Sequence, residues 1–206
     1  MVLDKTGTIT NGKPDVDNIF ASDELKEDEL LQIIGSLEAK SEHPIGTAII
    51  DKLKEKNIEI KHTKQFEAIS GKGIKAKIDD KTYYAGNEKL MKEQNINIQD
   101  KTDIFGKLYK KANTVVFVSD KSKLLGIIGV SDTIKPNSKK AISEFKKLEI
   151  ETYMLTGDNK VSAEAIANEV GIDNVISEVL PQDKEKKIRE LQEKGKKVAM
   201  IGDRNK

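Results

Sequence analysis

Asp4 and the four residues that follow it have the types and spacing of a phosphate-binding loop with its own nucleophile. An Asp at the carboxyl end of a parallel strand lies where such sheets bind ligands. Gly7 allows a sharp turn that brings backbone N–H groups toward an anion, and carboxylates that attack phosphate form aspartyl phosphates. An ordinary turn at a strand end is the alternative interpretation of these residues when they are taken alone.

Three further motifs carry other groups that phosphoryl transfer needs. Thr156-Gly157-Asp158 follows an apolar run, Pro181-Gln182-Asp183-Lys184 supplies a cation, and Gly202-Asp203 follows the last apolar run. Phosphoryl transfer depends on positioning and on neutralising negative charge. Taken singly, Thr156 is equally a strand end and Lys184 a solvated lysine, so only their joint order favours a site.

The run Asp4-Lys5-Thr6-Gly7-Thr8-Ile9-Thr10 resembles the phosphorylation signature of P-type ATPases without a break. That family belongs to the haloacid-dehalogenase-like superfamily, whose four phosphoryl-transfer motifs occur in the order found here. Asp132-Thr133-Ile134-Lys135-Pro136 also resembles a motif of the family's phosphorylation domain. The resemblance covers essentially the whole chain and implies that it uses ATP and Mg²⁺.

The resemblance implies a role for each matching residue. Asp4 is expected to attack the terminal phosphate of ATP, while Thr156 and Lys184 hold the phosphate oxygens. Mg²⁺ is expected to be bound by carboxylate and carbonyl oxygens, which suit this ion. The expected catalytic residues are Asp4, Thr6, Thr156, Gly157, Asp158 and Lys184, and the expected Mg²⁺ ligands are the carboxylates of Asp4 and Asp203 and the Thr6 carbonyl.

Three short elements in the middle of the chain together resemble the nucleotide-binding domain of heavy-metal P-type ATPases: Ser41-Glu42-His43-Pro44, Gly71-Lys72-Gly73 and Gly86-Asn87. From the residues alone, His43 is either a capping or packing residue or a ring that stacks on a purine. Glycine pairs alone usually mark a bulge or a tight hairpin. The resemblance implies nucleotide contacts at Glu42, His43, Gly71, Gly73, Gly86 and Asn87.

The same resemblance suggests the transported ion. The Ser-Glu-His-Pro element argues against the calcium and sodium pumps. The sequence Val130-Ser131-Asp132-Thr133-Ile134-Lys135 and the residues Gly86, Asn87, Leu90 and Met91 are more similar to copper(I) exporters than to zinc or cadmium exporters. Copper is therefore the expected cargo, by resemblance alone.

Composition excludes several other classes of function. The chain has 36 Lys and Arg against 35 Asp and Glu, so charge gives no reason to expect nucleic acid as a partner. It has no Cys and two His, which excludes disulfides and thiolate or His-rich metal sites. No apolar run approaches the roughly 20 residues that cross a bilayer. We expect a soluble fragment, located at the cytoplasmic face of a membrane in the full-length protein.

The predicted elements place the four motifs at strand ends. Strands are predicted at 115–118, 124–130, 152–155, 175–179 and 198–201, alternating with helices at 136–148, 160–170 and 182–194. This alternation predicts a doubly wound parallel α/β sheet. Residues 17–119 instead predict helices at 24–40 (capped by Ser22), 44–56, 87–94 and 101–111, and antiparallel strands at 64–69, 73–78 and 82–85 with a turn at Asp79-Asp80.

We therefore predict a haloacid-dehalogenase-like phosphorylation domain, residues 1–16 plus 120–206, with an inserted α+β nucleotide-binding domain, residues 17–119. The family's last motif normally continues Gly-Asp-Gly-x-Asn-Asp, whereas this chain reads Gly202-Asp203-Arg204-Asn205-Lys206. Because the second carboxylate is missing, we expect weak activity or none from the chain alone. Both ends fall where a pump would continue, so the expected partners besides ATP are its transmembrane and actuator domains.

Two other functions remain open. The first is a small-molecule phosphatase of the same superfamily, with residues 17–119 as its cap. Such enzymes usually place a second Asp, a general acid, two residues after the nucleophile, where this chain has Thr6. The second is a non-catalytic nucleotide-binding module, which would tolerate Asp4→Asn and leaves the ordered motifs unexplained.

Overall fold

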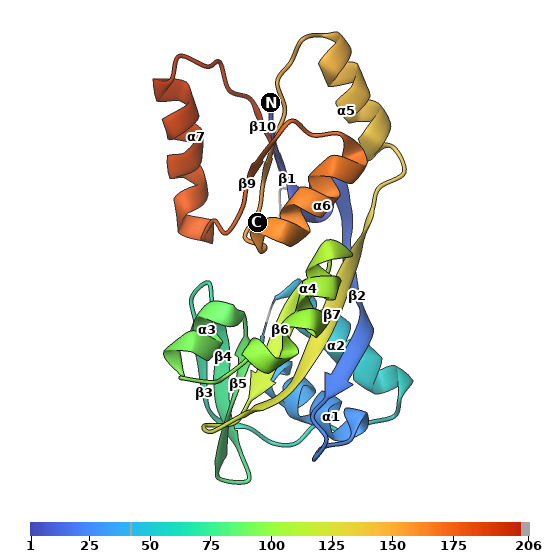
Figure 1. Cartoon of the computed structure of the whole chain (residues 1–206), viewed down its shortest axis with the longest axis vertical. Coiled ribbons are helices and arrows are strands. Elements are labelled where there is room, and N and C mark those ends of the chain that lie inside the picture. Colours follow the sequence, from blue (N-terminus) through green and yellow to red (C-terminus); the bar gives the residue numbers. More distant parts are fainter. Residues whose placement is uncertain (42, 203–206) are drawn as a thin grey trace. The chain divides into compact units, whose positions relative to one another are not determined.

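The computed structural model of the chain describes residues 1–41 and 43–202 (Figure 1). These residues form two compact units. The first unit contains Met1–Lys13, Tyr109–Ala112 and the chain from Asp132 onward, and the second contains Pro14–Leu108 and Asn113–Ser131. Each unit is built around its own sheet.

The sheet of the first unit is parallel and four-stranded, with the order β10-β1-β8-β9. Its strands are β1 (Val2–Asp4), β8 (Tyr153–Leu155), β9 (Asn174–Ile176) and β10 (Met200–Ile201). Its helices are α5 (Ser138–Lys147), α6 (Lys160–Val170) and α7 (Lys184–Glu193), and Figure 1 shows α7 on one side of the strands and α5 and α6 on the other.

Alternation along β1 explains the two covered faces. Leu3 packs with Ile142 of α5 and Ile166 of α6, whereas Val2 packs with Leu191 of α7. Because successive strand side chains point to opposite faces, Asp4 shares the face of Val2. The predicted α/β fold with a doubly wound parallel sheet is confirmed, and it turns Asp4 toward the helix that begins with Lys184.

The sheet of the second unit has six strands in the order β2-β7-β6-β5-β4-β3, and its neighbours from β7 to β3 are antiparallel. The strands are β2 (Thr10–Ala21), β3 (Lys64–Ile69), β4 (Gly73–Ile78), β5 (Lys81–Gly86), β6 (Thr114–Ser119) and β7 (Leu124–Ile134). The helices are α1 (Glu27–Glu38), α2 (Pro44–Glu55), α3 (Glu88–Glu93) and α4 (Thr102–Lys110). Buried aliphatic side chains of α1 and α2 pack against strands β4 to β7.

The hairpin between β4 and β5 has the predicted turn. Asp79 and Asp80 lie between the two strands with φ values of 48° and 62°. Two-residue hairpin loops favour positive φ at both central positions, which Asp tolerates better than most residues. This turn sets the register in which Gly73 pairs with Gly86.

Three predictions about the elements were wrong. Strand β2 was missed, because Pro14 and the scattered polar residues give it no strand pattern in the sequence. It lies at the edge of its sheet, where proline is tolerated. Strands β6 and β7 form an antiparallel pair rather than opening the parallel sheet, because the four residues between them are too few for a parallel crossover. Helix α1 begins at Glu27 with Lys26 as its N-cap, not with Ser22.

Two limits of the compact units fall inside strands, and a further pair encloses Tyr109–Ala112 at the end of α4. The two limits inside strands lie between Lys13 and Pro14 in β2 and between Ser131 and Asp132 in β7. The predicted domains changed at residues 16 and 119 instead. The assignment of a phosphorylation role to one part of the chain and a nucleotide role to the other stays a prediction.

Candidate functional site

The loop after Asp4 has the geometry of a tight turn. Thr6 has φ −73° and ψ 124°, and Gly7 has φ 81° and ψ −14°. These are the angles of a type II turn, which requires positive φ at its third residue and therefore favours glycine there. The turn follows β1 directly, so it holds Asp4 at the carboxyl edge of the parallel sheet.

Lys184 neutralises the Asp4 carboxylate. Its Nζ lies 3.0 Å from Asp4 Oδ1 and 3.1 Å from Oδ2, so the ammonium contacts both oxygens. The Asp4 side chain is 7% exposed and the Lys184 side chain 25%. A buried carboxylate needs such a partner, because removing a charge from water costs several kcal/mol. Solvent or a ligand therefore reaches this pair more readily at the Lys184 end.

A second buried ion pair connects the first two motifs. Lys5 Nζ lies 2.5 Å from Asp158 Oδ2, and the Thr156 hydroxyl donates to the same Asp158 oxygen at 2.8 Å. The Asp158 N–H in turn donates to the Thr156 hydroxyl oxygen at 3.2 Å. Since β1 and β8 pair with Asp4 opposite Leu155, Thr156 is the next residue at the same edge. The structure thus brings Asp4, Thr156, Asp158 and Lys184 to one edge of the sheet, and their catalytic roles stay predictions.

The fourth motif also reaches this edge. A Cβ added to Gly202 would lie 3.9 Å from the Cβ of Asp4. The predicted Mg²⁺ ligand Asp203 lies outside the described residues, and those that are described contain no cluster of three acidic or His side chains able to hold a metal ion. What the described chain offers Mg²⁺ is the Asp4 carboxylate and the Thr6 carbonyl, both oxygen donors of the kind that Mg²⁺ prefers.

The predicted nucleotide residues lie in the second unit. His43 caps helix α2: its Nδ1 accepts a hydrogen bond from the Ile45 N–H at 3.2 Å. The ring is at the surface of the unit. The capping role considered for His43 is therefore present, and Glu42 beside it lies outside the described residues.

The predicted glycines bring two backbones close together. A Cβ on Gly73 would lie 2.1 Å from the Ala85 carbonyl oxygen, and one on Gly86 would lie 2.1 Å from the Lys72 carbonyl oxygen. Asn87 fixes this arrangement, since its side chain donates to the Gly71 carbonyl at 2.9 Å and caps α3 through the Leu90 N–H. The structure brings Gly71, Gly73, Gly86 and Asn87 together. The close approach of the two backbones is by itself a sufficient reason for glycine at positions 73 and 86.

Glu38 is a candidate that our sequence reasoning missed. It is 8% exposed, and its Oε2 has no hydrogen-bond partner among the described residues. A Cβ on Gly46 would lie 2.7 Å from that oxygen, so the glycine leaves room for it. Burial raises the pKa of the Glu38 carboxyl, while a hydrogen bond from Ser41 lowers it. The sequence signal that could have revealed Glu38 is its position four residues after Ile34, which places a carboxylate on the apolar face of α1.

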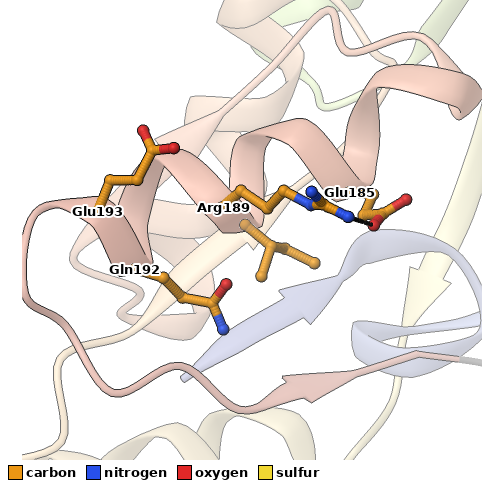
Figure 2. Close-up of a pocket in the computed structure, with 5 residues that line it drawn as sticks. Glu185, Arg189, Gln192 and Glu193 are labelled. Atoms are coloured by element: carbon orange, nitrogen blue, oxygen red, sulfur yellow. Dashed lines mark hydrogen bonds and ion pairs between the residues drawn. The ribbon is translucent and has the colours of Figure 1, made fainter.

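A cavity elsewhere in the first unit does not coincide with these residues. It has a volume of about 530 Å³ and is lined by one helix, α7, through Glu185, Ile188, Arg189, Gln192 and Glu193. Figure 2 shows Arg189 paired with Glu185 along the helix, at 2.6 Å. The lining residues form no part of the predicted site. The ion pair between these two exposed side chains contributes little to stability. We assign this cavity no function.

Comparison with known proteins gives consistent matches over the whole chain. A family model described as haloacid dehalogenase-like hydrolase matches residues 1–205. Copper-exporting P-type ATPases from Staphylococcus saprophyticus and Staphylococcus aureus strain RF122 are 44% and 43% identical, over 98% of this chain and 25% of each relative. The chain thus spans about a quarter of the length of these relatives.

Solved structures agree with the sequence matches. The catalytic domain of the CPx-ATPase CopB-B, from a study of conformational changes upon nucleotide binding, is 29% identical with a TM-score of 0.76, over 98% of this chain and 69% of that one. A zinc-transporting PIB-type ATPase in the E2.Pi state is 31% identical with a TM-score of 0.62, over 98% and 32%. The predicted resemblance to heavy-metal P-type ATPases is confirmed. In residues 1–41 and 43–202, no helix combines the length and apolar character of a membrane span.

Proposed function

This chain belongs to the haloacid dehalogenase-like hydrolases, and we propose that it is the phosphorylated and ATP-binding part of a copper-transporting P-type ATPase. The observation that carries the proposal is the buried Asp4 carboxylate, both of whose oxygens accept hydrogen bonds from the Lys184 ammonium. Asp4 ends β1 and directly precedes a type II turn. The identity to copper-exporting relatives supports copper as the cargo. In a longer chain, the expected partners are the membrane and actuator domains.

The proposed reaction is an in-line attack by Asp4 on ATP. One Asp4 oxygen forms a bond to the γ-phosphorus, the bond from that phosphorus to the β,γ-bridging oxygen breaks, and ADP leaves with the electron pair. The Lys184 ammonium contacts the Asp4 carboxylate before ATP binds. It is placed to contact the phosphate oxygens instead, as negative charge develops on them. The Thr156 hydroxyl lies at the same sheet edge, and it would donate to a phosphate oxygen by giving up its hydrogen bond to Asp158.

The other side chains of the site hold these groups in place. Lys5 and Asp158 form a buried pair that orients the Thr156 hydroxyl. Mg²⁺, when bound, would neutralise phosphate charge, and Asp4, the Thr6 carbonyl and Asp203 are the proposed ligands. Because Thr6 has no acidic side chain, a general acid for rapid hydrolysis is missing from that position. This chemistry favours a lasting aspartyl phosphate over a phosphatase.

We place the adenine of ATP beside α1 and α2. Glu38 Oε2 is a buried acceptor without a partner in the described chain, and the adenine amino group is a donor that would satisfy it. The His43 ring lies at the N-terminus of α2, a few residues before Gly46, which packs on Glu38. His43 is proposed to stack on the purine, and Gly71, Gly73, Gly86 and Asn87 to form the backbone wall of the site. Glu42 stays in the proposed set.

Calorimetric titration with ATP tests the nucleotide site. His43→Ala and Glu38→Gln are each expected to weaken ATP binding by about tenfold, the loss of one good contact. His62→Ala, the other histidine and an exposed one, is the control and should bind as the unaltered chain does. Unchanged affinity in both site variants would contradict the placement of adenine.

The phosphorylation step is tested with radiolabelled ATP and with a fluoride mimic of phosphate. Asp4→Asn is expected to abolish both the covalent label and binding of the mimic, while ATP binding persists because the nucleotide residues lie in the other unit. A folded chain that does not bind ATP but hydrolyses small phosphate esters would instead favour the phosphatase.

A further inference from the structure

The segment that joins β7 to α5 contacts backbone oxygens of the loop after Asp4. The Lys135 ammonium donates to the Gly7 carbonyl at 2.5 Å, and the Lys135 N–H donates to the Ile9 carbonyl at 3.0 Å. The Ser138 hydroxyl, at the start of α5, donates to the same Ile9 carbonyl at 2.7 Å. These contacts take no part in the bond-making step proposed above, yet they hold the loop that carries the nucleophile.

The end of β7 also holds the far end of the loop, through Asp132. One Asp132 oxygen accepts from the Thr10 hydroxyl at 2.5 Å and from the Gly12 N–H at 3.2 Å, and the other accepts from the Lys13 N–H at 3.3 Å. A Cβ on Gly12 would lie 3.1 Å from the Gly7 Cα, so the returning chain packs directly against the turn. The turn is therefore enclosed between Gly12 and the Lys135 side chain.

We infer that Lys135 is a positioning residue for phosphoryl transfer at Asp4, an inference that rests on the proposed function. Its ammonium fixes the Gly7 carbonyl, in the residue whose positive φ makes the turn. Because a trans peptide is planar, fixing that oxygen also fixes the Thr8 N–H, which points the opposite way. A charged donor holds a carbonyl more strongly than a neutral one. The turn is thereby set before the phosphate arrives.

The test compares three variants of this chain. Lys135→Met removes the donor, Lys135→Arg restores a charged donor, and Lys139→Met changes an exposed lysine of α5 as the control. The rate of covalent labelling of Asp4 by radiolabelled ATP is measured together with the Kd for ATP. A displaced reacting group costs up to about 100-fold in rate.

Lys135→Met is expected to label about 10- to 100-fold more slowly, with a Kd for ATP within about twofold of the unaltered chain. Lys135→Arg should recover most of the rate, and Lys139→Met should lose none. Labelling of Lys135→Met at the original rate would overturn the positioning role. A parallel loss of ATP affinity, or slow labelling of Lys135→Arg with a native amide spectrum, would also count against it.

Two arrangements keep the result interpretable. If Lys135→Met does not give the native amide spectrum, Lys135→Gln replaces it with the same expectation, since its amide is a shorter, uncharged donor. If the unaltered chain is not labelled by ATP and binds neither ATP nor the fluoride mimic, the proposed function itself fails. If the unaltered chain is labelled and the Lys135 variants match it, the positioning role alone fails.

Discussion

The Asp4 and Lys184 side chains form a buried ion pair at the position proposed for the nucleophile. The Lys184 ammonium lies 3.0 and 3.1 Å from the two Asp4 oxygens, so it contacts both almost equally. The second pair, Lys5 with Asp158, lies close by and leaves the Thr156 hydroxyl oriented by a fixed acceptor. Each of these four charged side chains therefore has a partner of opposite sign. On the proposed function, a bound phosphate would meet charges that are already held in place.

Glu38 is a buried carboxyl that lowers the stability of the fold when it is charged. Its folded pKa lies above the ordinary value of 4.5, because burial disfavours the charged carboxylate. Its contribution to stability is therefore full below 4.5 and is lost as pH rises through the folded pKa. Glu38→Gln has no charge to bury, so its unfolding free energy relative to the unaltered chain should rise between acidic and neutral pH, by about 1 kcal/mol.

Urea unfolding at the two pH values measures this difference. The same variant is expected to bind ATP more weakly, so stability and binding should change in opposite directions. Parallel pH profiles for the two chains would show that Glu38 is not held with a raised pKa.

At the scale of elements, the β4–β5 hairpin determines where the glycine elements meet. The turn at Asp79 and Asp80 sets a register that places Gly73 opposite Gly86. Helix α3 then starts at Asn87, whose side chain returns to the Gly71 carbonyl. The wall proposed for the nucleotide is thus a consequence of strand register. A side chain on either paired glycine would force the strands apart.

Gly73→Ala tests this packing. Its Cβ would meet the Ala85 carbonyl oxygen at 2.1 Å, at a φ of +147° that other residues rarely adopt. We expect a loss of about 1–3 kcal/mol in unfolding free energy, as for other overpacked positions. Gly106→Ala in α4 is the matched control, because a Cβ there meets nothing within 4 Å.

Replacing a helical glycine with alanine should stabilise the chain by about 0.5–1 kcal/mol. Thermal unfolding of both variants measures the contrast. Equal stability of Gly73→Ala and the unaltered chain would mean that the two backbones separate easily.

At the scale of the whole chain, the proposed phosphoryl site and a structural ion-pair network lie at opposite edges of the parallel sheet. Thr156 follows β8 at the edge of Asp4, and Thr152 precedes β8 at the opposite edge. There Asp173 accepts from the Thr152 N–H at 3.0 Å and from its hydroxyl at 2.8 Å, and lies 3.0 Å from the Lys146 ammonium. This network joins α5, the start of β8 and the loop between α6 and β9, at the edge opposite to the proposed phosphoryl site.

Asp173 is expected to make the unfolding free energy of the chain depend on pH in the acidic range. The Lys146 hydrogen bond, with those from Thr152, lowers its pKa from 3.8 to about 2. A carboxyl with a depressed pKa stabilises the fold above its ordinary value, and this contribution disappears as pH falls from 3.8 to about 2. Asp173→Asn should therefore be less stable than the unaltered chain near pH 4 and equally stable near pH 2, within about 0.5 kcal/mol.

Urea titrations across this range, with Glu169→Gln as an exposed acidic control in α6, measure the effect. A constant difference between Asp173→Asn and the unaltered chain over the whole range would contradict it.

The sequence by itself determined the fold class and the four motifs, because these depend on local patterns. Apolar runs followed by Asp4, Thr156 and Gly202 predicted strand ends of a parallel sheet, and helix α6 has the predicted bounds. Gly7 was predicted to turn the chain, and its φ of 81° does so. Such features follow from backbone preferences and periodicity within about ten residues.

Only the tertiary structure decided which distant groups meet. It placed Lys184 on Asp4 and Lys135 on Gly7, contacts 180 and 128 residues apart in sequence. It also showed that β6 and β7 pair in the antiparallel sheet, not in the parallel one, and that Glu38 is buried beside Gly46. Pairing of strands and burial of a carboxylate depend on the summed packing of remote segments, which no local pattern contains.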